Sequence, residues 1–266
     1  MEVIIRPNEA SASWLVAWVI ANQLRAKPES VLGLATGRTM ESVYAELARL
    51  HREEGLDFSR CQSFNLDEYI GLRPDDPRSY HSFMRQHFFG KVNLKPQNGH
   101  VPDGTAANLD AECARYEAVI AAAGGIDLQL LGIGRAGHIG FNEPLSALRS
   151  RTRAKGLTPT TREQNARYFG GDANAVPTRA ITVGVGTILE SRRCLVLATG
   201  AEKSEIVAKA VEGPITAMVT ASALQLHPCC TVVVDEAAAG RLSGKDYYRW
   251  LFENEPEWAE ARGMKR

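Results

Sequence analysis

Short apolar runs alternate with longer segments in which apolar and polar residues are mixed, from one end of the chain almost to the other. A run of a few apolar residues that stops at a glycine or a polar residue is typical of a buried strand. This pattern predicts strands at residues 3–5, 31–35, 62–66, 126–133, 180–185, 194–198 and 230–234. The regular alternation indicates a layered fold in which helices connect the strands.

Between several of these strands, apolar residues recur three and four positions apart, which predicts amphipathic helices. After the 31–35 strand this spacing is carried by Met40, Val43, Tyr44, Leu47 and Leu50. Ser11 is placed to cap an earlier helix, which carries Trp14, Leu15, Trp18 and Val19 on one side. Further helices are predicted at residues 79–89, 110–123 and 202–211.

Strands that alternate with helices usually pair in parallel, through right-handed crossovers. The predicted fold class is therefore α/β, with a Rossmann-like, doubly wound, mostly parallel sheet and helices on both faces. The sequence contains no internal repeat and no low-complexity tract. We therefore expect residues 1–266 to form a single domain.

The charge balance narrows the class of partner. Lys plus Arg and Asp plus Glu both number 31, whereas a dedicated nucleic-acid-binding protein usually has a basic surplus. No apolar run approaches the ~20 residues that a membrane helix needs, and the N-terminus lacks the pattern of a signal peptide. We expect a cytoplasmic protein that binds neither nucleic acid nor a membrane.

The cysteines predict neither a disulfide framework nor a metal site. They are odd in number and form no C-x-x-C pair and no zinc-ligand spacing: Cys61, Cys113, Cys194, Cys229 and Cys230. Several lie in apolar, strand-like runs. We interpret them as buried, reduced thiols.

Candidate functional residues lie just beyond the predicted strands, at the sheet edge where open α/β folds bind ligands. The loop A-T-G-R-T joins a strand to a helix, so its N–H groups and the helix dipole favour an anion. Its candidate binding residues are Thr36, Gly37, Arg38 and Thr39. The loop lacks the Gly-Lys-Ser/Thr of a nucleoside triphosphate site, and taken alone it also fits an ordinary strand-to-helix turn.

Acid–base candidates follow other strands. Asp67, after the 62–66 strand, could remove a proton from a carbon next to a carbonyl group, with Glu68 as its rival. His138 and Glu143 follow the 126–133 strand, and Lys203 follows the 194–198 strand. Each also has a structural explanation, as a turn or cap residue or a buried histidine. Their convergence on one sheet edge favours a functional site.

The glycines near His138 match a dinucleotide fingerprint in spacing, as Gly132-x-Gly134-x-x-Gly137. A dinucleotide fingerprint opens a helix and is followed after ~20 residues by an acid for the ribose. Here the glycines open a loop that ends at Pro144, and no acid occurs between Glu143 and Glu163. We therefore do not expect NAD to bind.

A basic run follows Pro144 and has few acids in its own segment: Arg149, Arg151, Arg153, Lys155, Arg162, Arg167 and Arg179. Such a run is usually a solvated surface. In a protein of zero formal net charge it favours small phosphates over a polymer.

Three motifs carry a resemblance to a known family: F-N-L-D-E-Y, G-H-I-G-F-N-E-P and T-V-G-V-G-T. Together with the A-T-G-x-T loop, N-A-R-Y-F and L-Q-L-H-P, they closely resemble the glucosamine-6-phosphate deaminases, over nearly the whole chain and in order. The resemblance implies conversion of glucosamine 6-phosphate and water into fructose 6-phosphate and ammonia, without a metal or an organic cofactor.

The resemblance also implies roles for individual residues. Asp67 resembles the base that moves a proton from C2 to C1, His138 the acid–base that opens the sugar ring, and Glu143 the carboxylate that orients the imidazole. Gly37, Arg38 and Thr39 resemble the phosphate loop, which Arg167 and Lys203 complete.

Two positions depart from the family pattern. Ala136 stands where Asp or Asn is usual, so one hydrogen bond to the imidazole is absent and ring opening is expected to be less assisted. Arg38 stands where Gly or Ser is common. A loop that binds through backbone N–H groups tolerates this side chain pointing outward, and Arg38 could also contact the phosphate.

Allosteric hexameric members of the family bind a regulatory sugar phosphate through a serine and an Arg-x-Lys pair at subunit interfaces. Ser146, Arg153 and Lys155 match those positions. The resemblance thus implies a homo-oligomer, such as a hexamer, activated by N-acetylglucosamine 6-phosphate. The alternative is that these residues belong to the solvated basic run.

Other functions remain open. A galactosamine-6-phosphate deaminase differs only in the orientation of one hydroxyl group of its substrate. A 6-phosphogluconolactonase is disfavoured, because lactone hydrolysis has no use for the F-N-x-D-E-Y carboxylate. A non-catalytic sugar-phosphate sensor is suggested by Ala136, although no DNA-binding helix pair supports it.

Overall fold

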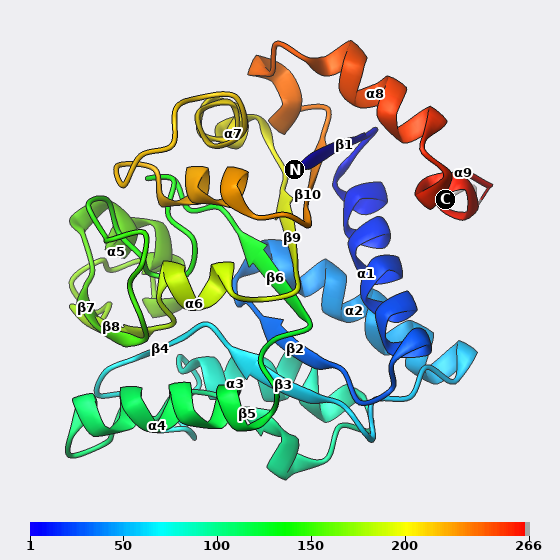
Figure 1. The fold of residues 1–266 in the computed structure, drawn as a ribbon. Coiled ribbons are helices and arrows are strands. Elements are labelled where there is room, and N and C mark those ends of the chain that lie inside the picture. Colours follow the sequence, from blue (N-terminus) through cyan, green and yellow to red (C-terminus); the bar gives the residue numbers. More distant parts are fainter. Residues whose placement is uncertain (264–266) are drawn as a thin grey trace.

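The computed structural model describes residues 1–263, and within them seven parallel strands form a central sheet (Figure 1). From one edge to the other these are β1 (Glu2–Arg6), β10 (Cys230–Asp235), β9 (Arg193–Ala198), β6 (Leu128–Gly132), β2 (Val31–Leu34), β3 (Gln62–Asn65) and β5 (Gly99–His100). Neighbouring strands pair in parallel throughout this sheet. The predicted fold class is confirmed.

Helices cover both faces of the sheet (Figure 1). On one face lie α1 (Glu9–Ala26), α2 (Arg38–Glu54) and α3 (Tyr80–His87), and on the other lie α4 (Leu109–Ala122), α6 (Val185–Leu189) and α7 (Ser204–Val211). The chain runs outward in one direction from β2 to β3 and in the other from β6 to β9. Because β2 and β6 are neighbours, the winding reverses between them, and the loops after these two strands diverge to leave a crevice.

The centre of the sheet is apolar on both faces, as parallel sheets between two helical layers require. Every residue of β10 is buried, and in β9 only Arg193 is partly exposed. Helix α2 buries the predicted stripe of Met40, Val43, Tyr44, Leu47 and Leu50. Local apolar pattern alone therefore accounts for this part of the fold.

The predicted start of α1 was wrong by three residues. Asn8, in an extended conformation, caps the helix, and its Oδ1 accepts a hydrogen bond of 2.9 Å from the N–H of Ser11. Ser11 is thus the residue that is capped, in the first turn, and not the cap. At α3 the capping residue is Ser79, whose side chain accepts a hydrogen bond from the N–H of Ser82.

A second, antiparallel sheet of three strands in the described chain lies beside the first: β4 (Asp67–Tyr69), β8 (Arg179–Thr182) and β7 (Arg153–Gly156). The prediction that residues 180–185 continue the parallel arrangement was wrong, since β8 runs antiparallel to both its neighbours and α6 begins at Val185. An apolar run indicates a buried strand, but it does not identify the partner strand. Between β7 and β8 the chain forms α5 (Pro159–Asn165) and the 3-10 helix η3 (Ala166–Phe169).

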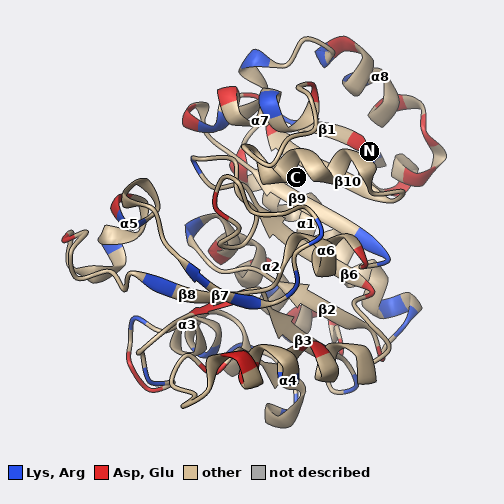
Figure 2. Cartoon of the chain, turned by 60° about the vertical axis from the view of Figure 1, so that its left-hand side comes forward, with Lys and Arg blue, Asp and Glu red and all other residues tan. Residues whose placement is uncertain are grey.

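The basic run faces more acids than its own segment contains. Arg151 pairs with Glu117 of α4 at 2.6 Å and with Glu190 at 2.5 Å. Figure 2 shows basic residues along β7 and β8 beside the acidic residues of α4. Residues distant in sequence thus supply countercharges to Arg151 that its own segment does not contain.

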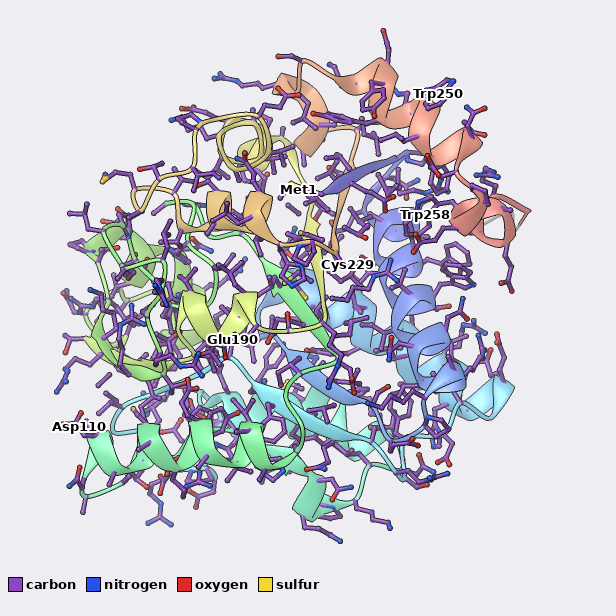
Figure 3. The ribbon with its side chains drawn as sticks, in the orientation of Figure 1. Met1, Asp110, Glu190, Cys229, Trp250 and Trp258 are labelled. Carbon is purple, nitrogen blue, oxygen red and sulfur yellow. The ribbon has the colours of Figure 1, made fainter. Side chains whose placement is uncertain are left out.

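The C-terminal helices α8 (Lys245–Asn254) and α9 (Ala259–Gly263) lie at the β1 edge of the sheet (Figure 1). Trp258 is buried, with its ring centroid 6.4 Å from that of Trp18 on α1. Trp250 is 56% exposed and points away from the body of the protein (Figure 3). Within residues 1–263, no helix has the length and apolar character needed to cross a membrane.

The thiols are free, and the prediction of burial holds at Cys61, Cys113, Cys194 and Cys230. For Cys229 it was wrong, because that residue is exposed. Cys229 lies just before β10, and its side chain is exposed although an apolar strand follows it in sequence.

Candidate active site

A cavity opens at the carboxyl edge of the parallel sheet, where the winding reverses between β2 and β6. Its walls come from segments far apart in the sequence. Among the predicted site residues, those that line it are Thr36, Gly37, Arg38, Thr39, Asp67, His138, Arg167 and Lys203. The predicted site residues outside the lining are Glu143, Ser146, Arg153 and Lys155.

The loop after β2 forms an anion-binding wall. Gly37 immediately precedes α2 and has a φ of 107°, a conformation that strongly favours glycine. Since Gly37 has no side chain to cap the helix, the first N–H groups of α2 stay available to a bound anion. The Arg38 guanidinium is 4.0 Å from Glu9, and its side chain is 64% exposed. The side chain of Arg38 therefore turns toward α1, and the loop offers mainly backbone donors and threonine hydroxyls.

Two cations complete this end of the cavity. Lys203 ends the 3-10 helix η4 (Ala201–Lys203), and its Nζ donates a hydrogen bond of 2.6 Å to the carbonyl oxygen of Ile133. Burial lowers the pKa of Lys203 to about 8, so its charge is sensitive to pH in the neutral range. Arg167 belongs to η3, and its guanidinium lies 5.0 Å from the centre of the Tyr168 ring.

Asp67 provides a carboxylate to the lining of the same cavity. It is the first residue of β4 and is 6% exposed. Burial, and then the charge of Glu68, raise the pKa of Asp67 well above its ordinary value. A carboxylate held in this way is a stronger base once ionised than one in water.

Glu68, the rival base, is already committed to holding α3. Its Oε1 accepts hydrogen bonds from the N–H groups of Tyr69 and Tyr80, at 2.8 and 3.0 Å. Its Oε2 accepts one from the N–H of His81 at 3.0 Å and contacts the His81 ring at the same distance. Glu68 is therefore a structural anchor, and Asp67 is the member of the pair that faces the cavity.

One of the glycines that matched a dinucleotide fingerprint, Gly134, instead makes room for His138. A side chain at Gly134 would place its Cβ 2.0 Å from His138 Nε2. Gly137 has a φ of 79°, and its N–H donates to the carbonyl oxygen of Gly134 at 2.9 Å, closing a tight turn. These glycines thus bend the loop so that the imidazole lies over the backbone of Gly134.

Gly140 brings this loop against Asp67. A Cβ at Gly140 would lie 3.4 Å from Asp67 Oδ2 and 2.9 Å from Thr182 Oγ1. Thr182 in turn accepts a hydrogen bond from the N–H of Phe141 and pairs with Asp67 across β4 and β8. The acid and the imidazole are therefore held by one continuous set of contacts.

Glu143 lies behind His138, with its Oε2 3.4 Å from His138 Nδ1. Burial would raise the pKa of Glu143, but the nearby His138 imidazole, the Thr161 side chain and the hydrogen bond from the N–H of Thr158 outweigh it and lower the pKa to about 2. The carboxylate is thus ionised throughout the physiological range. It can orient the imidazole and stabilise its protonated form. Within residues 1–263, it is the one acid within 4.0 Å of the His138 ring nitrogens.

Several cavity residues were missed by the sequence reasoning. Tyr80, Phe141, Gln164 and Asn165 also line it. Asn165 lies in the N-A-R-Y-F motif, which signalled the segment but not this side chain. Tyr80 follows a helix cap and carried no separate signal.

Ser146, Arg153 and Lys155 lie outside the cavity, close to the Glu143 loop. The N–H of Ser146 donates to the carbonyl oxygen of Glu143 at 3.0 Å. Arg153 donates to Asn142 Oδ1 at 2.8 Å. Lys155 is two residues from Arg153 on β7, and so shares a face of that strand with it. Among the described residues, Ser146 Oγ and Arg153 Nη2 are buried without a hydrogen-bond partner.

Comparison with known proteins places these features in one family. Residues 8–236 match the family described as glucosamine-6-phosphate isomerases/6-phosphogluconolactonase. A protein of Arthrobacter sp. (strain FB24) called glucosamine-6-phosphate deaminase is 52% identical over 97% of this chain and 99% of its own length. The Giardia intestinalis protein called glucosamine-6-phosphate deaminase 2 is 54% identical over 87% of this chain and 88% of its own length.

Solved structures show the same relationship. One described as a monomeric glucosamine-6-phosphate deaminase superposes with a TM-score of 0.88 at 46% identity, over 90% of this chain and 99% of that one. The 6-phosphogluconolactonase from Trypanosoma cruzi superposes with a TM-score of 0.73 at 19% identity, over 91% of this chain and 97% of that one. The second match shows a shared fold alone.

Proposed function

Since this chain belongs to the family of glucosamine-6-phosphate isomerases and 6-phosphogluconolactonases, we propose that it converts glucosamine 6-phosphate and water into fructose 6-phosphate and ammonia. One observation carries the proposal: Asp67 and His138 open onto the same cavity as the loop of Thr36 to Thr39. A substrate with a phosphate at one end and an acidic C–H bond at the other fits this arrangement. The relatives from Arthrobacter and Giardia, with about half of their residues identical, are named for this reaction.

The phosphate binds at the fixed end of the cavity. The first N–H groups of α2 and the hydroxyls of Thr36 and Thr39 donate hydrogen bonds to its oxygens, and Lys203 and Arg167 balance its charge. This fixes C6 of the sugar and directs C1 and C2 toward Asp67 and His138.

Ring opening and isomerisation follow at the other end. His138 takes the proton of the C1 hydroxyl and supplies one to the ring oxygen as the C1–O5 bond breaks, giving the open-chain aldehyde. Asp67 then removes the proton from C2 and delivers it to C1, while the O1 oxygen gains a proton and the amino nitrogen loses one, which leaves a C1 hydroxymethyl group and a C2 ketimine. Water adds to C2, the C–N bond breaks, and ammonia and fructose 6-phosphate remain. The raised pKa of Asp67 suits a group that must hold a proton between two transfers.

The lactonase alternative is less well supported. Hydrolysis of a lactone needs no base beside C2, whereas the cavity is lined by the buried carboxylate of Asp67, and Glu68 is occupied in binding α3. The similarity to lactonase structures is a similarity of fold, at 19% identity for the T. cruzi enzyme.

The decisive test measures ammonia and fructose 6-phosphate released from glucosamine 6-phosphate, with galactosamine 6-phosphate as the matched epimer. We expect release of both products from the glucosamine substrate. Turnover of the galactosamine epimer alone would assign the other deaminase. Binding of both esters with turnover of neither would instead indicate a sugar-phosphate sensor.

We also propose that Ser146, Arg153 and Lys155 bind N-acetylglucosamine 6-phosphate as an activator, in a homo-oligomer such as a hexamer. The buried, unpartnered Ser146 Oγ and Arg153 Nη2 support a polar ligand there. The related solved structure at 46% identity is described as monomeric, so the assembly state of this chain is the first measurement to make. A monomer in sedimentation, together with no change of rate on adding the activator, would remove this proposal.

A cytoplasmic location completes the proposal. The free thiols, buried at Cys61, Cys113, Cys194 and Cys230, support a reducing compartment.

The release of ammonia by water makes the second half of the reaction hydrolytic, whereas the first half is an isomerisation.

A further inference from the structure

We propose that Thr158 is a positioning residue that holds the Glu143 carboxylate against His138, and that it thereby couples helix α5 to proton transfer at the sugar ring. This inference rests on the proposed function, because it concerns the ring-opening step. Thr158 was not among the residues singled out from the sequence.

The contacts fix one oxygen of Glu143 and leave the other for the imidazole. Glu143 Oε1 accepts a hydrogen bond from the N–H of Thr158 at 3.0 Å and contacts the Thr158 hydroxyl at 3.2 Å. Its Oε2 faces His138 Nδ1 at 3.4 Å. Because Glu143 is ionised, the hydroxyl proton of Thr158 is drawn to Oε1. The carboxylate therefore cannot rotate without breaking two hydrogen bonds.

Thr158 is also the residue that begins α5. Its side chain accepts a hydrogen bond from the N–H of Thr161 at 3.3 Å, as an N-cap does. The two hydroxyls lie 3.2 Å apart. One side chain thus caps the helix and contacts the carboxylate, so Glu143 and the start of α5 move together.

The far end of α5 is tied to the same loop. Gln164 Oε1 accepts a hydrogen bond of 3.1 Å from the N–H of Arg135, which precedes His138 by three residues. Beyond Gln164 the chain continues into η3, which carries Arg167 into the cavity wall. The segment that carries a phosphate-binding cation is therefore the one that positions the carboxylate behind the imidazole.

Ala136 makes this linkage more important. It has no side-chain acceptor, so among the described residues Glu143 is the one acid within reach of His138. Where a single carboxylate orients the imidazole, a displacement of that carboxylate is not compensated by a second one. The orientation of His138 thus depends on the position of α5.

The test compares Thr158→Val with two matched variants. Valine keeps the branched shape and the backbone N–H but deletes the hydroxyl, whereas Thr158→Ser retains it. Thr160→Val makes the same chemical change two residues away, at an exposed position of α5. We expect Thr158→Val to lower kcat for glucosamine 6-phosphate about tenfold, with KM and the Kd of inorganic phosphate within about twofold of wild type.

The pH dependence gives the signature that a merely structural change would not produce. The Thr158 hydroxyl contacts Glu143 Oε1 at 3.2 Å, so we expect its removal to raise the pKa of Glu143 and to move the acid limb of the kcat profile to higher pH in Thr158→Val. Thr158→Ser restores both the rate and the limb, and Thr160→Val matches wild type. A parallel loss of kcat and phosphate affinity with an unmoved acid limb would overturn the inference, as would a Thr158→Val enzyme indistinguishable from wild type.

A readout independent of turnover separates this inference from the proposed function. Carbon NMR of the Glu143 carboxyl group reports its titration midpoint directly, which Thr158→Val should raise and Thr160→Val should leave in place. If wild type releases no ammonia, the proposed function fails while this measurement still tests the link between Thr158 and Glu143. An unchanged midpoint in Thr158→Val would overturn the link even in an active enzyme.

Discussion

The parallel sheet and the small antiparallel sheet both contribute residues to the same cavity, but different forces hold them. In β9 and β10 nearly every residue is buried between helical layers, so apolar burial fixes the parallel sheet. Strand β7 is only partly buried and carries Arg153 and Lys155. The chain around it is held by polar contacts with distant residues.

Glu117 shows how these polar contacts work. This carboxylate on α4 accepts hydrogen bonds from the N–H of Thr152 at 2.8 Å, from the hydroxyl of Thr187 at 2.7 Å, and from Arg151 at 2.6 Å. It therefore joins α4, the entry to β7 and α6 at one point. Removing it would loosen that region while leaving the core of the parallel sheet intact.

The two regions therefore share the tasks of the cavity. The rim of the parallel sheet provides the phosphate loop, Lys203 and the loop that carries His138. The antiparallel sheet provides Asp67, and the segment between β7 and β8 provides Thr158 and Arg167. Asp67 and the contacts behind His138 thus belong to the part of the molecule that polar contacts adjust most readily.

The largest effect should come from Asp67→Asn, which removes the base at the small-sheet end and leaves the phosphate end unchanged. We expect kcat to fall by about 10³-fold, since general base catalysis contributes in that range, while KM changes little. Steady-state kinetics with glucosamine 6-phosphate measure both. Glu68→Gln is the matched control, expected to impair folding or stability more than proton transfer. Retained turnover in Asp67→Asn would remove it from the role of base.

A pair of stability variants tests the contrast between the two regions. Leu130, in β6, is fully buried, so Leu130→Ala should cost about 2–5 kcal/mol of the free energy of unfolding. Glu117→Gln should cost about 1–3 kcal/mol through the lost charge-assisted hydrogen bonds. Urea unfolding gives both values.

Hydrogen exchange then shows where each change acts. Glu117→Gln should speed exchange in residues 151–157 and leave β6 and β9 protected, whereas Leu130→Ala should weaken protection throughout the sheet. Burial alone would raise the pKa of Glu117, but hydrogen bonds from Thr152 and Thr187 lower it overall. The stability that the ionised Glu117 side chain contributes is therefore fully present above pH 4.5, its ordinary pKa, and is lost as the pH falls through the lowered pKa. Equal loss of protection in both regions would contradict the contrast.

The same contrast explains what could be predicted from the sequence. The strands around Leu32, Leu130 and Val233 were predictable because local apolar runs encode them, and the winding order then placed Thr36 and His138 at one edge. The pairing of β8 with β4 was not, because no local pattern identifies an antiparallel partner more than 100 residues away in sequence. Nor were Glu117 and Thr158, whose importance depends on hydrogen bonds to residues distant in the chain.

The phosphate end should respond to pH through Lys203. Burial lowers its pKa to about 8, so the unliganded enzyme loses this positive charge as the pH rises through that value, and KM for the phosphate ester should increase above it. Lys203→Gln should raise KM about 10–100-fold, the effect of one charge-assisted hydrogen bond, and should abolish the rise above pH 8. A wild-type KM that stays flat from pH 7 to 9 would show that Lys203 does not bind the phosphate.

The smallest expected effect is at Ala136, two residues before His138. Ala136→Asp adds an acceptor near His138, so the imidazole no longer depends on Glu143 alone. We expect kcat to rise about two- to fivefold, or less than ~1 kcal/mol of barrier, with KM unchanged. Ala136→Asn separates the two contributions of the new side chain, because it supplies the acceptor without the charge.

The double variant Ala136→Asp/Thr158→Val sharpens the comparison between the regions. If a second carboxylate orients His138 from its own loop, the imidazole becomes independent of α5, and the loss caused by Thr158→Val should shrink from about tenfold to about twofold. Kinetics of the four combinations measure this coupling directly. Additive effects would show that the new carboxylate does not free the imidazole from α5. A single variant at Ala136 whose rate and pH profile match wild type would show that Ala136 costs the enzyme nothing.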